Sequence, residues 1–264
     1  MMITIFTIAG SAVYAAEIPV SDQDQLITSN DWTEISNLQD EMKKEEPDAT
    51  IDYDKALKVY VDCNLIKLQT ADTKKLTSAL ESANYVWVIP FKMEKTYGMF
   101  TVAKGLPLRE EAKSVLTKAE QEEVKNHAGK WMITEIAEHT VEPYYDILLE
   151  KREALSDCTR VVLVGSQPGM RQPVALGMDD ETARIWISLG YQYPVMEKIP
   201  ETQNVESGVY SFDSVAEISD TYIEDSEVST GVGVQSRSSM KYVAGIGIVS
   251  VSYTHLTLPT ILRV

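Results

Sequence analysis

The segment Tyr85-Val86-Trp87-Val88-Ile89-Pro90-Phe91 decides the fold class, because every residue in it except the proline is aromatic or β-branched. A polar turn at Glu94–Thr96 and a second run of similar composition at Tyr97–Ala103 follow it. Two such runs joined by a short polar turn are typical of a β-hairpin. Pro90 cannot donate a hydrogen bond to a ladder, so we expect it at a sheet edge or at a bulge.

The hairpin pattern recurs further along the chain. Arg160–Val164 is a compact apolar strand, and Pro173–Met178 and Thr182–Leu189 predict a second hairpin across Asp179–Glu181. Ala56–Leu68 has β-branched and aromatic residues and predicts a further strand that ends in a turn. Strands joined as hairpins, with few strand–helix crossovers, favour an α+β fold with a mainly antiparallel sheet.

A few short helices are expected among these strands. Thr117 and Glu120 match a capping box, which predicts a helix that Gly129 ends in a left-handed conformation. Helices are also expected over Thr73–Ser82 and Tyr144–Leu155, and Trp131–Ala137 alternates like a half-buried strand. We therefore expect one compact α+β domain over residues 50–200.

The composition limits the partners of this domain. The chain has 264 residues, of which 44% are hydrophobic and 24% charged, as in ordinary folded proteins. Asp and Glu number 40 against 24 Lys and Arg, so the net charge is −16. Because affinity for nucleic acid comes from Lys and Arg, the charge predicts no nucleic-acid partner.

The N-terminal region predicts export. Residues 1–16 contain no charged side chain and are apolar from Ile3 to Val13, which is too short to span a bilayer but fits the hydrophobic part of a signal peptide. A buried N-terminal strand or helix is the alternative. Residues 17–49 are polar and predict a connector with one short helix that carries Trp32, Ile35 and Leu38 on one face.

The C-terminal region predicts a stalk and an anchor. Residues 201–241 are rich in Ser, with eight acidic residues against Arg237 and Lys241, and this composition is typical of a disordered linker. Residues 242–250 are uncharged and apolar, and we interpret them as a truncated transmembrane segment. The alternative is a terminal β-strand that packs on the domain.

The last residues of the chain have a different origin. Val251–Thr260, which reads VSYTHLTLPT, resembles the translation of an adapter used in DNA sequencing libraries. We therefore exclude residues 251–264 as a non-native tail, so His255 indicates no site, and we expect the natural protein to continue beyond Ser250.

Signal, ectodomain, acidic stalk and membrane segment together resemble the layout of uncharacterised exported, membrane-anchored surface proteins of Gram-positive bacteria. The resemblance implies a place in the cell membrane with an extracellular domain, and it leaves the activity open. We expect a non-enzymatic binding or structural envelope protein whose partners are the membrane and an unknown extracellular protein or glycan. The alternatives are an extracellular hydrolase acting on peptide or glycan, or a transmembrane sensor ectodomain.

Few residues carry a chemical signal. Cys63 and Cys158 form either a disulfide, as is common in exported chains, or two independent buried thiols. Tyr191 and Tyr193 lie outside a clear strand and are the candidates for ligand contact. The loop Gly165–Gly169 matches no nucleophile or phosphate motif and predicts a turn. No residue pattern predicts a catalytic, cofactor-binding or metal site.

Overall fold

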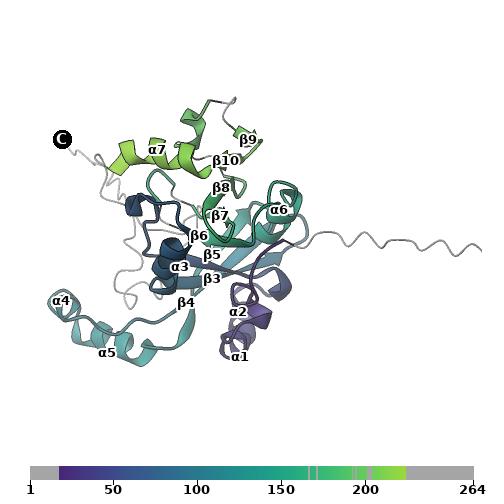
Figure 1. Cartoon of the computed structure of the whole chain (residues 1–264). Helices are drawn as coiled ribbons and strands as arrows, with labels where there is room; N and C mark the ends of the chain where they lie inside the picture. Colours follow the sequence, from purple (N-terminus) through teal and green to yellow (C-terminus); the bar gives the residue numbers. More distant parts are fainter. Residues whose placement is uncertain are drawn as a thin grey trace, which may run out of the picture.

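The computed structural model describes residues 18–165, 167–170, 172–191, 193, 195–200 and 204–223. Their strands form one mixed sheet in the order β5-β4-β3-β2-β6-β7-β8-β10-β9, with β1 paired to β3 (Figure 1). Strands β2 and β6 run parallel, and the other ladders of this order are antiparallel. The prediction of an α+β domain with a mainly antiparallel sheet is confirmed. The strands are β1 (Thr50–Ile51), β2 (Leu57–Val61), β3 (Asn84–Lys92), β4 (Tyr97–Lys104), β5 (Trp131–Thr140), β6 (Arg160–Val164), β7 (Val174–Met178), β8 (Ala183–Ser188), β9 (Asn204–Glu206) and β10 (Val209–Ser211).

Short helices connect and cover these strands. They are α1 (Trp32–Ile35), α2 (Gln39–Glu45), α3 (Thr73–Glu81), α4 (Glu110–Lys113), α5 (Lys118–His127), α6 (Tyr144–Glu150) and α7 (Phe212–Ile223). The predicted capping box is present at the start of α5, and Gly129 follows that helix with φ +76°. Among the described residues, no helix has the length and apolar character needed to cross a membrane.

The hairpin expected from residues 85–103 is formed by β3 and β4. Pro90 lies inside β3, opposite Met99 of β4, and not on an edge strand. Its carbonyl accepts a hydrogen bond from the Asp52 backbone N–H at 2.9 Å. Because the N and C=O of one residue in an antiparallel strand point to the same side, the missing N–H faces the two-residue strand β1. The proline is tolerated because its non-donating side meets only this short strand.

The two faces of the sheet carry different cores, because successive side chains alternate across a strand. On the first face, Val59 and Leu163 pack in a cluster with Tyr144, Ile147 and Leu148 of α6. The second face has two clusters. One contains side chains of α3 and α7, and the other packs Ile35 and Met42 of the α1–α2 region against β3, β4 and β5.

Residues 18–26 are inserted into the sheet where β2 and β6 separate. Strands β2 and β6 share a short parallel register, Val59 with Leu163 and Tyr60 with Val164. Beside that register, the segment bridges both strands: the Val161 N–H donates to Pro19, and the Lys58 N–H donates to Asp24. The prediction that residues 17–49 form a connector is therefore wrong for the described part, whose apolar side chains enter the core: Ile18, Val20, Leu26, Ile35, Met42 and Ala49 are buried.

Part of the predicted stalk is also folded. Strands β9 and β10 extend the sheet beyond β8, and α7 places Phe212 and Val215 in the second-face core. The prediction of disorder from residue 201 is wrong for residues 204–223, because a few well-spaced apolar residues are enough to dock an acidic helix. The expected signal (1–16), the rest of the stalk, the membrane segment (242–250) and the tail (251–264) lie outside the described residues.

The connection between β4 and β5, which carries α4 and α5, projects from the body of the molecule (Figure 1). Its base is held by backbone hydrogen bonds from Gly105 to Lys130 and from Gly129 to Gly105. A Cβ atom at Gly105 would lie 2.1 Å from the His127 carbonyl oxygen, so this close approach requires glycine.

Candidate ligand-contact site

A β-bulge in β5 determines which way Glu135 faces. Opposite residues are Val102 with Ile133 and then Thr101 with Glu135, so Thr134 is the extra residue in the ladder. Before the bulge, Ile133 faces the second-face core. After it, Glu135 shares the first face with its partner Thr101. Bulges of this kind are used in proteins to redirect a side chain.

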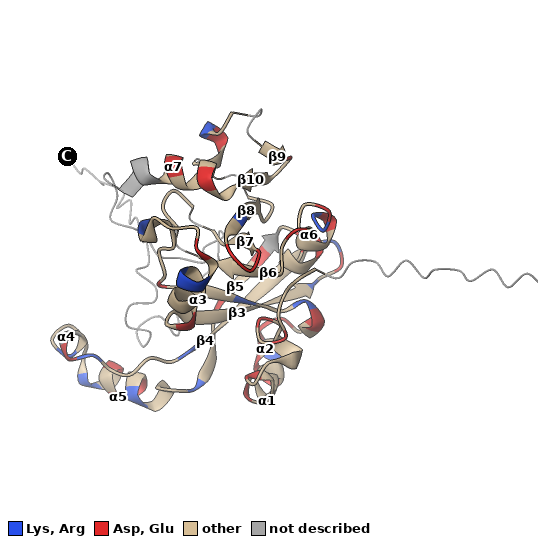
Figure 2. Cartoon of the chain, viewed as in Figure 1, with Lys and Arg blue, Asp and Glu red and all other residues tan. Residues whose placement is uncertain are grey.

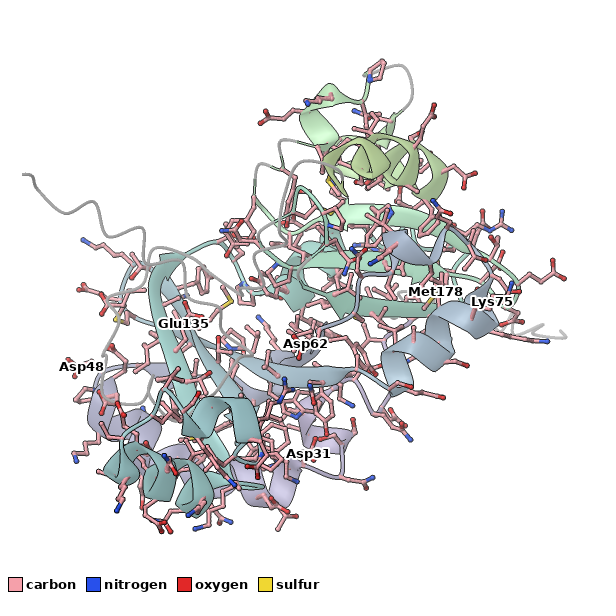
Figure 3. All side chains as sticks on the ribbon, turned by 90° about the vertical axis from the view of Figure 1, so that its left-hand side faces the viewer. Asp31, Asp48, Asp62, Lys75, Glu135 and Met178 are labelled. Carbon is pink, nitrogen blue, oxygen red and sulfur yellow. The ribbon has the colours of Figure 1, made fainter. Side chains whose placement is uncertain are left out.

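The bulge explains why sequence alternation missed Glu135. Strict alternation along Trp131–Ala137 places residue 135 on the same face as Trp131 and Ile133, both of which are buried on the second face. The Thr134 hydroxyl donates to the Thr101 carbonyl at 3.1 Å, which ties the extra residue to β4. Figure 3 shows Glu135 on the β4–β5 side of the molecule, well apart from Lys75 of α3 and Met178 of β7.

Two tyrosines meet on the first face. Tyr144 begins α6 and is buried, and Tyr191 follows β8 and is partly buried. Their hydroxyl oxygens are 3.4 Å apart, and their rings make an edge contact with centroids 6.4 Å apart. Gly190, with φ +81°, turns the chain before Tyr191, and a Cβ there would lie 2.9 Å from Val141. The close packing of Gly190 against Val141 therefore fixes the turn that places Tyr191.

Glu135 acts electrostatically on both tyrosines. The effect is a minor one, because burial is the largest cause that raises the pKa of Tyr144 and of Tyr191. Tyr191 and Tyr193 raise the pKa of Tyr144 more than Glu135 does, and the hydrogen bond with Tyr144 lowers the pKa of Tyr191 more than Glu135 raises it. Burial alone raises the pKa of Glu135 to about 7, and no hydrogen bond or ion pair joins its carboxylate to another described residue. Among the described residues, Glu135 is therefore a partly buried carboxylate without a counter-ion, and the contact between the two phenols does not include it.

The two predicted ligand-contact tyrosines have different environments. Tyr193 is only 2% exposed, and its hydroxyl donates to the Pro173 carbonyl at 2.5 Å. These contacts make Tyr193 a packing residue of the second-face core. Tyr191 keeps partial exposure and remains a candidate for ligand contact.

The cysteines are free in the structure, so the disulfide alternative is not the one observed. Cys63 belongs to the second-face core and Cys158 to the first-face core, so the sheet lies between them. Burial raises the pKa of Cys63 to about 12 and that of Cys158 to about 11. Both side chains are therefore protonated thiols that act as small hydrophobic residues.

The loop that follows β6 has a structural role. The Gln167 side chain is buried; it accepts a hydrogen bond from the Leu65 N–H at 2.9 Å and donates to the carbonyls of Cys63 and Gly165. Gly169 has φ +73°, as a turn here requires. Within the described residues, no group of three or more His, Cys, Asp and Glu is placed to hold a metal ion.

A buried ionic cluster on the second face was not predicted from the sequence. Asp24 is 2% exposed, and its carboxylate accepts hydrogen bonds from Ser21 at 2.6 Å, Tyr60 at 2.7 Å and Arg160 at 3.1 Å. The Lys58 ammonium is 3.8 Å from the same carboxylate. These contacts tie the inserted segment 18–26 to β2 and β6.

Aromatic rings complete the surroundings of Lys58. Its ammonium lies 4.5 Å from the ring centroid of Tyr85 and 5.2 Å from that of Trp87. Burial lowers the pKa of Lys58, and the Asp24 charge opposes this shift. Asp31 accepts hydrogen bonds from the Tyr85 hydroxyl and the Trp87 indole, at 2.8 Å and 3.0 Å. Most polar groups of this cluster form hydrogen bonds or ion pairs with one another, whereas the Glu135 carboxylate has no such partner among the described residues.

Comparison with protein-family models, with curated proteins and with solved structures finds no match for this chain. No known relative therefore indicates what the candidate sites bind, and their chemistry is inferred from the residues of this chain alone. Glu135 offers an acidic acceptor and Tyr191 a partly exposed phenol, and each of these groups can bind a polar or charged group.

Proposed function

We propose that the chain is a non-enzymatic binding or structural ectodomain of a bacterial cell surface. In this proposal residues 1–16 direct export, and residues 242–250 belong to the membrane anchor. The acidic composition and the two uncharged apolar segments support this arrangement. The partner is an extracellular protein or glycan.

The observation that carries the binding role is the state of Glu135. A partly buried carboxylate without a counter-ion costs folding free energy, and such groups concentrate at functional sites. The Asp24 carboxylate shows the other solution, in which hydrogen bonds and cations compensate the charge internally. We take the uncompensated carboxylate of Glu135, which keeps partial exposure, as the part of the surface that receives a ligand.

The test begins with the uninterrupted gene from the same source. We expect the codons after Ser250 to add roughly ten apolar residues and then Lys or Arg, since a membrane helix needs about 20. The product of that gene, expressed in a Gram-positive host, should fractionate with membranes and should be cleaved when protease is added to intact cells. A soluble product that is protected from the protease inside the cell contradicts the proposal.

A variant that lacks residues 2–16 is the matched control for export. It should stay inside the cell and survive the protease. If it reaches the surface as well as the complete product does, residues 1–16 are not the export signal.

A further inference from the structure

We propose that the outer edge of β5 is a dimerisation surface, at which β5 of a second copy of this chain pairs antiparallel and continues the sheet. In this pairing a two-fold axis passes through the bulge at Thr134, and Ile133 of each copy lies opposite Ile136 of the other. The dimer goes beyond the proposed binding role and does not depend on it, because strand geometry and charge alone carry the argument.

The first argument is the position of β5 in the sheet. It ends the strand order with ten residues, whereas β9, at the other border, has three. Within the described residues, β4 is the only strand that pairs with β5. A border strand of this length presents a row of backbone donors and acceptors to which a further extended strand can bind.

The ladder with β4 determines which backbone groups of β5 point outward. The Gly105 N–H donates to the Lys130 carbonyl at 2.9 Å, so residue 105 faces β5. Because the facing alternates along an antiparallel strand, the odd-numbered residues of β4 also face β5, and the even-numbered ones face β3. The β5 residues opposite even-numbered positions therefore direct their N–H and C=O groups away from β4, and these include Trp131, Ile133 and Ile136. The outward groups of these three residues form no hydrogen bond with another described residue.

The bulge leaves this edge able to pair with its own copy. Outward positions are odd-numbered before the bulge, as at Ile133, and even-numbered after it, as at Ile136. The side chains of both residues pack with the same second-face cluster. Residues opposite each other in an antiparallel pair lie on one face and direct their backbone groups alike, and Ile133 and Ile136 meet both conditions. A two-fold axis at the bulge therefore brings these two residues opposite each other, and it sets Trp131 opposite Glu138.

The second argument is the opposite charge of the two ends of β5. The exposed side chains of Lys104 and Lys130 lie at its start, where the Lys104 ammonium is 5.5 Å from the centroid of the Trp131 ring. The partly exposed Glu138 and the exposed Glu142 lie at its end. Antiparallel pairing about a two-fold axis places the basic start of one strand beside the acidic end of the other, and it does so twice in the same interface.

This charge pattern favours a second copy over another extended chain. Burial raises the pKa of Glu46, and the charges of Glu138, Glu45 and Asp48 raise it further, so the acidic end of β5 lies in an acidic environment. Figure 2 shows acidic residues on the α1–α2 segment and basic residues where the α4–α5 connection joins the sheet. A wholly basic segment would be repelled at the start of β5 and a wholly acidic one at its end, whereas β5 itself carries the charge that each end requires.

The experiment is sedimentation equilibrium of the purified full chain. We expect the mass to rise from 29.5 kDa toward twice that value as the concentration increases from about 10 µM to about 1 mM, since a contact of one strand is small and the dimer is weak. A chain that stays monomeric over this range overturns the proposal. If that monomer instead takes up an added extended peptide along β5, the edge serves a different protein.

Hydrogen exchange at the same concentrations locates the contact. The outward amides of Ile133 and Ile136 should become protected as the dimer forms. The amide of Val102, which already pairs with Trp87 of β3, should keep the same exchange rate. Dimers in which the Ile133 and Ile136 amides exchange as fast as in the monomer form elsewhere and overturn the proposal.

Two double variants test the charge pairing. K104E/K130E makes both ends of β5 acidic, and E138K/E142K makes both ends basic. Each variant should dimerise roughly ten-fold more weakly, or worse, because every substitution occurs twice in the interface. An equimolar mixture should form dimers again, since the acidic start of one variant meets the basic end of the other. The control K74E/K75E makes the same change of charge at exposed positions of α3 and should leave the dimer unchanged.

The mixture distinguishes loss of pairing from damage to the fold, because a misfolded variant does not regain dimers when its counterpart is added. General repulsion between copies is also controlled, since E138K/E142K makes the chain, of net charge −16, less negative. Dimers that neither variant weakens, or variants that stay monomeric when mixed, overturn the proposal. None of these results bears on surface display, which is measured on intact cells.

Discussion

Replacement of Asp24 by asparagine tests how the inserted N-terminal segment is held in the sheet. The variant keeps the shape of the side chain and removes its charge. It leaves the Lys58 ammonium, whose side chain is 11% exposed, and the Arg160 guanidinium, 27% exposed, without their buried counter-ion. Removal of one partner from a buried ion pair typically costs about 3–5 kcal/mol. We expect about 3 kcal/mol, at the lower end, because Arg160 retains access to water.

The assay is urea unfolding followed by tryptophan fluorescence at about pH 7. With a slope of roughly 2 kcal/mol per molar urea, a loss of about 3 kcal/mol lowers the midpoint by about 1.5 M. Burial lowers the pKa of Lys58, so loss of the Asp24 charge lowers it further. The folded state of the variant then binds a proton less readily than the unfolded state, and its stability should rise with pH below the normal pKa of lysine.

Two further variants complete the test. D22N removes an exposed carboxylate from the same turn and should change the stability by less than about 0.5 kcal/mol. K58M should recover part of the loss when combined with D24N, because it removes the uncompensated ammonium. Equal midpoints for D24N and the unmodified chain would refute the argument that Asp24 secures this segment.

Three further predictions concern the two cores and Glu135. G98A should lower the free energy of unfolding by several kcal/mol in a thermal melt, because its Cβ would lie 2.1 Å from the Phe91 ring and 2.8 Å from the Ala137 carbonyl oxygen. G208A is the control and should lower it by about 1 kcal/mol, since the nearest contact of its Cβ is at 3.8 Å. The pKa of Glu135 is raised to about 7 in the folded state, so stability should fall as the pH rises from about 4.5 to 7, and E135Q should remove this dependence in urea titrations; identical pH profiles contradict it. Cys63 and Cys158 should resist a thiol reagent in the native state and react after unfolding, and a reducing agent should leave the melting temperature unchanged; rapid native labelling contradicts the burial of these thiols.

Local patterns predicted most of the strands and helices correctly. The β3–β4 and β7–β8 hairpins, the α5 capping box and the strand β6 depend on neighbouring residues, so their signals are complete within a short window. The segment 204–223 escaped prediction because its acidic composition masks Phe212 and Val215, whose spacing is enough to dock α7. Composition averages over a segment, whereas docking depends on a few positions.

The candidate site was less accessible to sequence reasoning. Tyr191 was singled out because it lies outside a regular strand, whereas Glu135 was not singled out, since no residue type marks the bulge at Thr134 that turns it to the first face. The Asp24 cluster joins side chains from distant parts of the chain, and no local pattern connects them. Long-range partners of this kind appear only when the topology is known.

The insertion of residues 18–26 between β2 and β6 also has a consequence for the order of assembly. Asp24 and Arg160 are 136 positions apart in the chain. The segment 18–26 is synthesised early, but it can complete its contacts only after β6 has been synthesised. Loop-closure entropy makes contacts at such separation slow to form. Until β6 arrives, the β2 border remains an open template for other extended chains. The pairing of β2 with β6 is therefore the step of folding at which a nascent chain is most exposed to pairing with a wrong strand.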